Sequence, residues 1–412
     1  MIKLRNRLAI ALLAPAILIA LCLLADAFDW WDQITLGNST STEFSDLQQV
    51  TASAQCLTED SSRNLYERTC DPGGRPYNYP LIWAQVLSRL GVDVSATRGL
   101  GIVIILVFGV SIASISYRVL PKEINWSTFT AFVFSVLAPP TFLLLERGNI
   151  DALVFSILVI AAFSVLSHHP ISASVGFGIA TWLKIFPLPS VLALGRLPYG
   201  RRTAAITFVV VLGFGVIALL PSLEFVVSGT PQPLEGGFGA PHFFMVIWNL
   251  LEFPGASYGP RIFGVLSFAS LSLLYLMIVR RCKVQPHCSV FRAMPQQING
   301  HNDAATLIVI GLGSFLGAYI VGTNFDYRLV FLILLNLGIA ALGSKCHRYL
   351  LGLSWLLVGL MWCTYAAPIR LQQVADVIWF FLVPALLVLF VAVSRLGVAK
   401  KLSTDDNNPR KE

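Results

Sequence analysis

Charged residues are scarce in this chain of 412 residues. Asp, Glu, Lys and Arg make up 12% of it, about half of the roughly 25% that soluble domains carry. Hydrophobic residues make up 56%, and the mean hydropathy is +0.72. This balance excludes a soluble enzyme, a disordered tail protein and a disulfide-rich secreted module. It predicts an all-α, polytopic integral membrane protein, with residues 1–412 forming a single multi-pass domain.

Signals for several other classes of protein are missing as well. No basic run is interleaved with aromatic residues, so nothing indicates binding to nucleic acid. The net charge of +7 indicates an excess of Lys and Arg, which in membrane proteins is typical of the cytoplasmic loops. Cys282, His287 and Cys288 do not have the spacing of a zinc site. We therefore expect no metal and no cofactor. No convincing internal repeat of the kind common in transporters is present.

Long apolar segments recur along the chain. A helix that spans a bilayer needs about 20 mostly apolar residues, because lipid cannot satisfy a bare backbone. The segments that qualify are 8–25, 99–117, 127–145, 151–166, 203–221, 262–279, 304–322, 329–342, 350–366 and 374–394. Together with the two arms of segment 171–194, they predict about 10 to 12 transmembrane helices.

Segment 171–194 differs from the others because it is interrupted. It contains Lys184 followed closely by Pro187 and Pro189. Prolines remove backbone donors and kink or end a helix, so we expect two short helices that form a hairpin. The ammonium at the break is expected to face a polar cavity or to reach the membrane surface.

The distribution of Lys and Arg predicts the orientation of the chain. Most basic residues fall in cytoplasmic segments and most acids fall outside only if both termini are cytoplasmic and the number of passes is even. This arrangement gives a first outer loop at 28–98, a second outer loop at 222–260 and a cytoplasmic tail at 396–412. We expect a plasma or inner membrane location, and we expect segment 8–25 to be a retained helix rather than a signal peptide.

Several features stand out within the first outer loop. Cys56 and Cys70 predict a disulfide formed in an oxidising compartment, with two unrelated thiols as the alternative. Trp30 and Trp31 are typical of the aromatic belt at a membrane interface. Residues 81–90 are expected to form a short surface helix.

Ionisable residues collect at the expected outer ends of the helices, where they are costly and usually functional. The group comprises Asp46, Glu146, Arg147, Asp151, Lys184, Asp326, Arg328 and His242. Cations stabilise a phosphate leaving group, and a carboxylate accepts the proton of an attacking hydroxyl. The group therefore favours sugar transfer from a lipid phosphate. The structural alternatives are a polar turn with a local ion pair at 146–151 and a helix cap by Asp326 paired with Arg328.

Two of these motifs resemble those of a known family. They are Glu146-Arg147-Gly148-Asn149-Ile150-Asp151 and, after an apolar helix, the run from Ser174 to Pro187 that contains Gly178, Ala180 and Lys184. They resemble the GT-C superfamily of glycosyltransferases, and most closely glycosyltransferase family 87, the polyprenol-phosphate-mannose-dependent α-mannosyltransferases. That family commonly shows a Q/R-G-N turn, then G-x-x-x-G-x-A-x-x-x-K with a proline nearby. It also carries an early D-L element and a Y-P element, which correspond to Asp46-Leu47 and Tyr79-Pro80.

The resemblance covers roughly residues 46–202 and implies a helical bundle with a large first outer loop. It implies that Asp46 is the general base of an inverting transfer, with Glu43, Asp32 and Asp71 as competing acids. Lys184 and Arg147 would contact the donor phosphate, and Asn149 would bind the turn backbone or a sugar hydroxyl. We also assign Asp326, Arg328 and His242 to substrate binding. The partners implied are a polyprenol-phosphate sugar, a glycan or glycolipid acceptor and the lipid bilayer.

The chain departs from the family at two points. It has Phe325-Asp326-Tyr327-Arg328 where many members have a Pro-His-Tyr element, and its D-L element lacks the usual tyrosine. These departures leave the acceptor and the donor sugar open. A multi-pass transporter or lipid-linked-glycan flippase is the alternative function, and a non-catalytic scaffold is a third. An enzyme should bring Asp46 and Lys184 to one cavity, whereas a transporter should show a path to both sides of the membrane.

Overall fold

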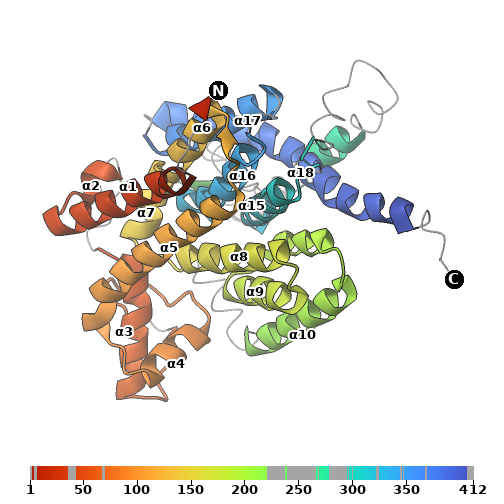
Figure 1. The fold of residues 1–412 in the computed structure, drawn as a ribbon. Helices are drawn as coiled ribbons and strands as arrows, with labels where there is room; N and C mark the ends of the chain where they lie inside the picture. The colour runs from red at the N-terminus through yellow and green to blue at the C-terminus, as the bar shows by residue number, and fades with distance from the viewer. Residues whose placement is uncertain are drawn as a thin grey trace.

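The described part of the chain is almost entirely helical (Figure 1), as predicted. The computed structural model describes residues 2–3, 7–35, 43–66, 70–219, 237–238, 266–267, 269–277, 295, 297–298, 300–321, 324–343, 346, 348–366 and 369–405. The helices are α1 (Arg7–Phe28), α2 (Trp31–Ile34), α3 (Ser45–Glu59), α4 (Leu81–Arg89), η1 (Val94–Ala96), α5 (Thr97–Val119), α6 (Trp126–Val136), α7 (Pro139–Glu146), α8 (Asp151–Leu166), α9 (Pro170–Leu183), η2 (Leu188–Arg196), α10 (Arg201–Leu219), α15 (Asn302–Val321), η5 (Asp326–Phe331), α16 (Leu332–Ala340), α17 (Arg348–Ala366) and α18 (Ile369–Asp405). The strands are β1 (Ile2–Lys3), β2 (Glu123–Ile124), β3 (Gly237–Phe238) and β4 (Asn324–Phe325).

Long apolar helices of the kind that membrane proteins contain are present in the described part of the chain. Among the described residues, 5 helices are long and apolar enough to cross a bilayer, namely Leu8–Phe28, Val94–Val119, Trp126–Glu146, Asn302–Ile320 and Val374–Ser394. Asp151–Leu166, Pro170–Leu183, Tyr327–Ala340 and Arg348–Thr364 are shorter apolar helices. The total of 10 to 12 passes and the orientation stay predictions.

The proline-broken hairpin has the predicted break, but its second arm is a 3-10 helix. α9 ends at Leu183, Lys184 is extended, and η2 follows after Pro187. Glycines of α15 let this helix approach the break closely, since a Cβ at Gly317 would clash with the carbonyl oxygen of Phe186. The Ser190 hydroxyl also donates to the carbonyl of Ile310 over 2.9 Å. The break is therefore held against α15.

Two short antiparallel sheets join distant segments near the ends of the bundle. β1 pairs with β2, and β3 pairs with β4. Arg118, near the end of α5, forms an ion pair of 3.4 Å with Asp303 at the start of α15. Since β2 follows α5 directly, the β1–β2 sheet lies near the start of α15. β4 follows the opposite end of α15 in the chain. β3 belongs to the predicted second outer loop, and its pairing with β4 brings part of that loop next to η5. His242 lies outside the described residues.

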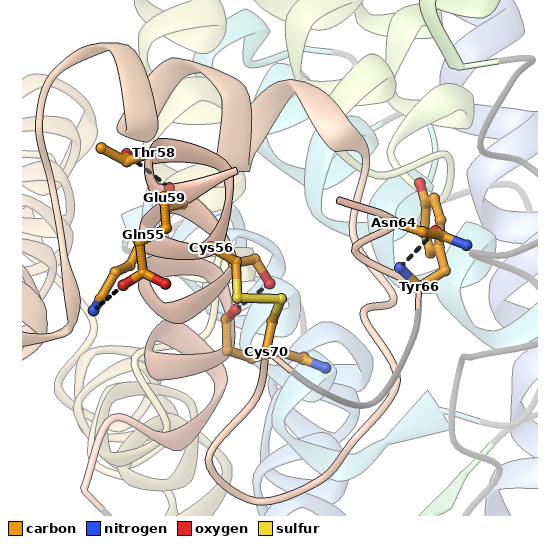
Figure 2. Close-up of a disulfide and its surroundings, with 10 residues drawn as sticks. Gln55, Cys56, Thr58, Glu59, Asn64, Tyr66 and Cys70 are labelled. Carbon is orange, nitrogen blue, oxygen red and sulfur yellow. Dashed lines mark hydrogen bonds between the residues drawn. A yellow bond between two sulfur atoms is a disulfide. The ribbon is translucent and has the colours of Figure 1, made fainter. Parts of the chain in front are cut away.

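The predicted first outer loop is largely folded rather than irregular. It contains α2, α3, α4 and η1, and α4 matches the helix expected at 81–90. The disulfide between Cys56 and Cys70 is present and ties the end of α3 to the segment that follows it (Figure 2). Trp31 corrects the expectation of an interfacial belt: it is buried and packs edge-on against Phe44, whereas Trp30 is half exposed.

The predicted cytoplasmic tail begins as helix. α18 runs from Ile369 to Asp405, so the first ten residues of segment 396–412 continue the last apolar helix. The remainder of the segment lies outside the described residues.

Candidate functional site

A glycine turn between α7 and α8 organises the polar residues. Gly148 has a φ of +58°, in the left-handed region that favours glycine. The turn meets the first turn of α3, where the backbone N–H of Asp46 donates to the carbonyl of Arg147 over 3.0 Å and that of Phe44 donates to Glu146 over 2.7 Å. The first N–H groups of a helix lack partners within it. No side chain caps the start of α3. The carbonyl groups of the turn act as the hydrogen-bond acceptors there instead.

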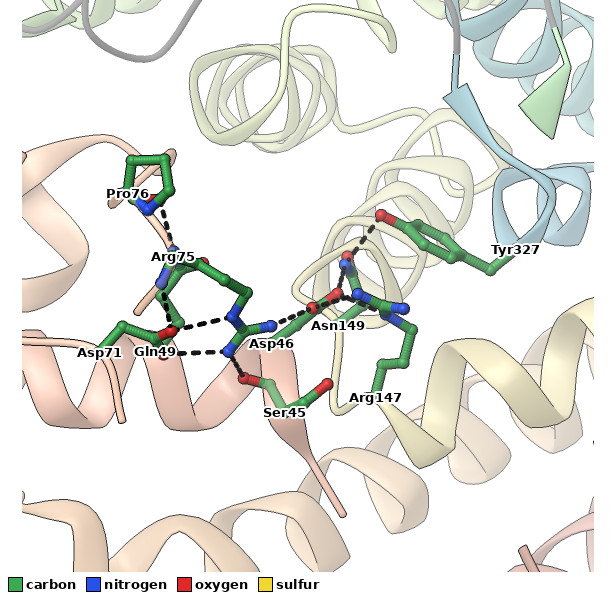
Figure 3. A network of polar contacts seen from close by, with 9 residues as sticks. All are labelled: Ser45, Asp46, Gln49, Asp71, Arg75, Pro76, Arg147, Asn149 and Tyr327. Carbon is green, nitrogen blue, oxygen red and sulfur yellow. Dashed lines mark hydrogen bonds and ion pairs between the residues drawn. The ribbon is translucent and has the colours of Figure 1, made fainter. Parts of the chain in front are cut away.

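Asp46 is the centre of the first group of contacts (Figure 3). Arg147 binds both of its oxygens, with Nε at 3.0 Å from Oδ2 and Nη2 at 2.8 Å from Oδ1. Asn149 donates to Oδ2 over 2.5 Å and also to the Tyr327 hydroxyl over 3.1 Å. Arg75 Nη1 lies 3.5 Å from Oδ1. Three chain segments far apart in sequence therefore converge on one carboxylate.

Arg75 belongs to the segment 71–80, between the disulfide cysteine Cys70 and α4, which we call the strap. Its guanidinium contacts both oxygens of Asp71 at 3.0 Å and donates to the Ser45 carbonyl over 2.6 Å. Gln49 of α3 donates to the carbonyl of Pro76 over 2.6 Å. Since Asp71 follows Cys70 directly, the covalent bond to α3 holds the strap beside Asp46.

Asp151 is the centre of a second group. Arg328 Nε lies 3.0 Å from Oδ2, and Lys184 Nζ lies 3.7 Å from Oδ1. The Lys184 ammonium stands 4.7 Å from the ring centroid of Tyr79, and the Arg328 guanidinium stands 5.0 Å from that of Phe186. Both are within the range of cation–π attraction. The break in the hairpin thus delivers a cation and an aromatic ring to the same place.

Asn149 joins the two groups into one cluster. Its Oδ1 accepts the backbone N–H of Asp151 over 2.9 Å, while its Nδ2 serves Asp46 and Tyr327. Tyr327 precedes Arg328 in η5, so this short helix contacts both centres. Asp46 and Lys184 therefore belong to one polar cluster built from α3, the strap, the Gly148 turn, the hairpin break and η5.

Charge is layered within the cluster. The carboxylates lie deep, and their side chains are 8%, 2% and 0% exposed for Asp46, Asp71 and Asp151. The cations lie above them, with side chains 33%, 16%, 17% and 14% exposed for Arg75, Arg147, Lys184 and Arg328. We refer to these four residues as the cationic rim. Their positive charges lie closer to the surface than the carboxylates do, so the rim presents charged hydrogen-bond donors to an incoming anion.

The ionisation of Asp46 follows from its partners. Burial by itself raises the pKa of Asp46, but the charge and hydrogen bonds of Arg147 outweigh burial, and Asn149 and Arg75 add to the effect. The pKa of Asp46 therefore lies below its usual value, and the carboxylate is ionised at neutral pH. With both oxygens held, it is a weak base in this arrangement.

The structure brings together Asp46, Arg147, Asn149, Lys184 and Arg328 as the sequence predicted. Arg147 pairs with Asp46 and Arg328 pairs with Asp151, and both ion pairs join segments that are far apart in the sequence. The structural alternative of an Asp326–Arg328 pair falls on a side chain outside the described residues. The side chain of Asp326, like His242, lies outside the described residues.

Four further residues of the cluster were not assigned as site residues from the sequence. They are Arg75, Tyr79, Asp151 and Tyr327. Signals existed for three of them, since Tyr79 lies in the Y-P element, Asp151 ends the Arg147 motif and Tyr327 precedes Arg328. Arg75 had no such signal, because its place depends on the disulfide and the path of the strap.

Comparisons of the chain with protein-family models, curated proteins and solved structures find no match. Within the part of the chain that the structure describes, no three His, Cys, Asp or Glu residues are grouped as ligands for a metal ion. The site is therefore interpreted from its own geometry.

Proposed function

We propose that the chain is a membrane glycosyltransferase. It moves a hexose, with mannose as the first candidate, from a polyprenol-phosphate donor to a glycan or glycolipid acceptor. The reaction takes place on the outer face of a plasma or inner membrane that the chain crosses 10 to 12 times, with both termini in the cytoplasm. The resemblance to glycosyltransferase family 87 supports the choice of donor, and the cluster supports the chemistry.

The observation that carries this proposal is the cationic rim above buried carboxylates. The phosphodiester of a polyprenol-phosphate sugar has one negative charge, which the partly exposed cations of the rim can bind. Arg and Lys form strong, charge-assisted hydrogen bonds with phosphate oxygens. Because the cations are partly exposed and the carboxylates are not, an anion meets the cations first.

The reaction is a single displacement with inversion at the anomeric carbon. The acceptor oxygen bonds to that carbon while its proton passes to Asp46. The bond between the anomeric carbon and the phosphate oxygen breaks, and its electron pair leaves with polyprenol phosphate. The new negative charge on the phosphate is stabilised by the rim, chiefly Lys184 and Arg147. No covalent enzyme intermediate is required.

Transport or flipping of a lipid-linked glycan is the alternative. Transporters usually place their charged sites near the bilayer midplane, within discontinuous helices. In this chain Arg147 caps the end of α7, Asp151 lies in the first turn of α8 and Lys184 caps the end of α9. Helix ends are the expected place for a site that meets a lipid headgroup at the membrane surface.

The test is transfer of labelled hexose by purified protein in lipid nanodiscs. The donors are synthetic polyprenyl-phosphate mannose, glucose and galactose, and a membrane glycolipid extract supplies acceptors. We expect one donor to be consumed with release of polyprenyl phosphate, and Asp46→Asn to slow transfer by about 10²–10⁴-fold because the base is lost. Asp60→Asn is the matched control, since Asp60 is an exposed acid at the end of α3 outside the cluster. Failure to consume any donor, or full activity of Asp46→Asn, contradicts the proposal.

A further inference from the structure

Both oxygens of Asp46 are engaged by other side chains. Arg147 takes one position on each oxygen, Asn149 takes a second on Oδ2, and Arg75 lies 3.5 Å from Oδ1. A carboxylate has about four lone-pair sites in all. Three of these sites take hydrogen bonds and the Arg75 guanidinium lies beside the fourth, so the hydroxyl of an acceptor meets a carboxylate that is already shared among three partners.

Arg147 is the partner best suited to move. Asn149 is 1% exposed and fixed by contacts to Tyr327 and Asp151, and the Arg75 guanidinium is held by Asp71 and the Ser45 carbonyl. Arg147 is the partner that contacts both oxygens, and its side chain reaches the accessible surface. Its planar fork matches a phosphate as well as it matches a carboxylate. The same guanidinium therefore has two ligands to choose between, the buried base and an incoming phosphate.

We propose that Arg147 couples donor binding to activation of the base, by giving up Asp46 for the donor phosphate when the donor binds. This inference rests on the proposed function and adds a role for Arg147 beyond phosphate contact. The bidentate pair keeps Asp46 from accepting a proton until a phosphate occupies the rim. Asn149 and Arg75 stay on the carboxylate and hold it in place during the exchange.

The charges around Asp46 favour this exchange. The groups that interact with Asp46 are Arg75 and Tyr79 from the segment between α3 and α4, Arg147 and Asn149 from the Gly148 turn, Lys184 from the hairpin break and Tyr327 from η5. Lys184 and Arg328 share Asp151, so they cannot both be neutralised by it. Arg147 lies 6.0 Å from the ring centroid of Tyr327, the residue before Arg328, so a phosphate drawn to this side of the rim approaches Arg147 as well.

The proton balance of the step is simple. Before the exchange, the ionised Asp46 is stabilised by a full positive charge. Afterwards that charge is shared with the phosphate, so the carboxylate binds a proton more readily. The acceptor hydroxyl supplies this proton as its oxygen attacks, and the electron pair of the broken glycosyl bond leaves on polyprenol phosphate.

Protonation of Asp46 can be followed directly with a hydrophobic carbodiimide, which reacts with protonated carboxyl groups. The labelled fraction of the Asp46 peptide is measured by mass spectrometry against pH, with and without saturating farnesyl phosphate. Loss of an Arg partner raises an Asp pKa by about 1–3 units, so we expect the labelling midpoint to rise by about that much. Farnesol and inorganic phosphate are compared to separate the effects of the lipid chain and the phosphate. Asp60 is the internal control and should not shift.

Two variants test whether Arg147 carries the effect. In Arg147→Gln the labelling midpoint should be high without ligand, and farnesyl phosphate should raise it by less than half of the wild-type shift. In Arg147→Lys the charge remains but the fork is lost, so the midpoint should lie between the other two. If neither variant folds, the wild-type measurement decides alone.

The outcomes separate the two proposals. If farnesyl phosphate binds in equilibrium dialysis but the Asp46 midpoint stays unchanged, the coupling is wrong while the glycosyltransferase proposal stands. If farnesyl phosphate does not bind, the coupling is overturned, and the hexose-transfer assay then decides the function independently. A shift in the wild type that persists in full in Arg147→Gln overturns the role of Arg147.

Discussion

Gly148 adopts a left-handed backbone conformation between two residues that bind Asp46. A side chain there would be strained, and its Cβ would lie 3.0 Å from the Cβ of Leu47. The turn must be this tight for Arg147 and Asn149 to reach the same carboxylate from one loop. Glycine is thus a geometric requirement of the cluster, although it contributes no chemistry.

Replacing Gly148 with Ala should therefore destabilise the protein. The left-handed conformation costs a non-glycine residue about 1–2 kcal/mol, and the contact with Leu47 adds to this loss. The measurement is thermal unfolding in detergent. Gly213→Ala is the control, because a Cβ at Gly213 in α10 meets nothing within 4 Å. Equal melting temperatures for Gly148→Ala and the wild type would show that the turn tolerates a side chain.

The lowered pKa of Asp46 makes part of the stability depend on pH. A carboxyl group whose folded pKa lies below its unfolded value of about 3.9 stabilises the fold above that value and ceases to do so as pH falls through the folded pKa. The difference in melting temperature between the wild type and Asp46→Asn should therefore be constant between about pH 5 and about pH 7, where the carboxyl is ionised in both the folded and the unfolded state. It should shrink below about pH 4. A difference that grows on acidification would mean that the carboxyl is protonated in the fold.

At the scale of elements, the disulfide attaches the strap, which carries Arg75, to α3, which carries Asp46. Cys56 lies on α3 and Cys70 starts the segment that carries Asp71 and Arg75. Hydrogen bonds of Arg75 and Gln49 also hold the strap against α3, and the disulfide fixes the point where the strap begins. A disulfide in this position fits a protein whose site faces an oxidising compartment.

Reduction should weaken the protein through this strap. Closing a loop of about 15 residues is worth about 3 kcal/mol on the loop-entropy model. We expect dithiothreitol to lower the melting temperature of the wild type and to leave that of Cys56→Ser/Cys70→Ser unchanged. Cys363→Ser, which alters a free and exposed cysteine, is the control and should respond like the wild type. A wild type that is insensitive to the reductant would remove the disulfide from this account.

For the whole molecule, the connectivity of the helices places the cluster at one end of the bundle. α7 ends, α8 begins, α9 ends and η5 begins at the cluster. The apolar span Trp126–Glu146, which consists of α6 and α7, ends at the cluster and begins just after β2, the strand that pairs with the N-terminal strand β1. The proposed orientation therefore assigns opposite sides of the membrane to the cluster and to β2.

Single cysteines can test this orientation in cells. We expect Ser62→Cys, on the exposed turn after α3, to react with a membrane-impermeant maleimide from outside intact cells. Lys122→Cys, exposed beside β2, should react only after the membrane is permeabilised. Both variants are made in a background without the other free cysteines. Labelling of both positions from the same side would contradict the orientation, and protection of Ser62→Cys in intact cells would move the site to the cytoplasm.

The sequence alone determined the class of the protein and most of its cluster. The scarcity of charge and the recurring apolar segments predicted a helical membrane protein, because a helix satisfies the hydrogen bonds of its own backbone within lipid. The break at Pro187 and the helix at 81–90 were also predictable, since both depend on local residue types. Asp46, Arg147 and Lys184 stood out because charges near membrane helices are rare.

Only the tertiary structure decided which of these charges pair. Arg147 lies 101 residues from Asp46 in the chain, and Arg328 lies 177 from Asp151, so no local pattern links them. Burial of Trp31 and the place of Arg75 likewise depend on how α3 and the strap fold onto the bundle. Residue types state what chemistry is available. The packing of distant elements sets the distances at which opposite charges meet, and those distances determine which base is held and which cations remain for an anion.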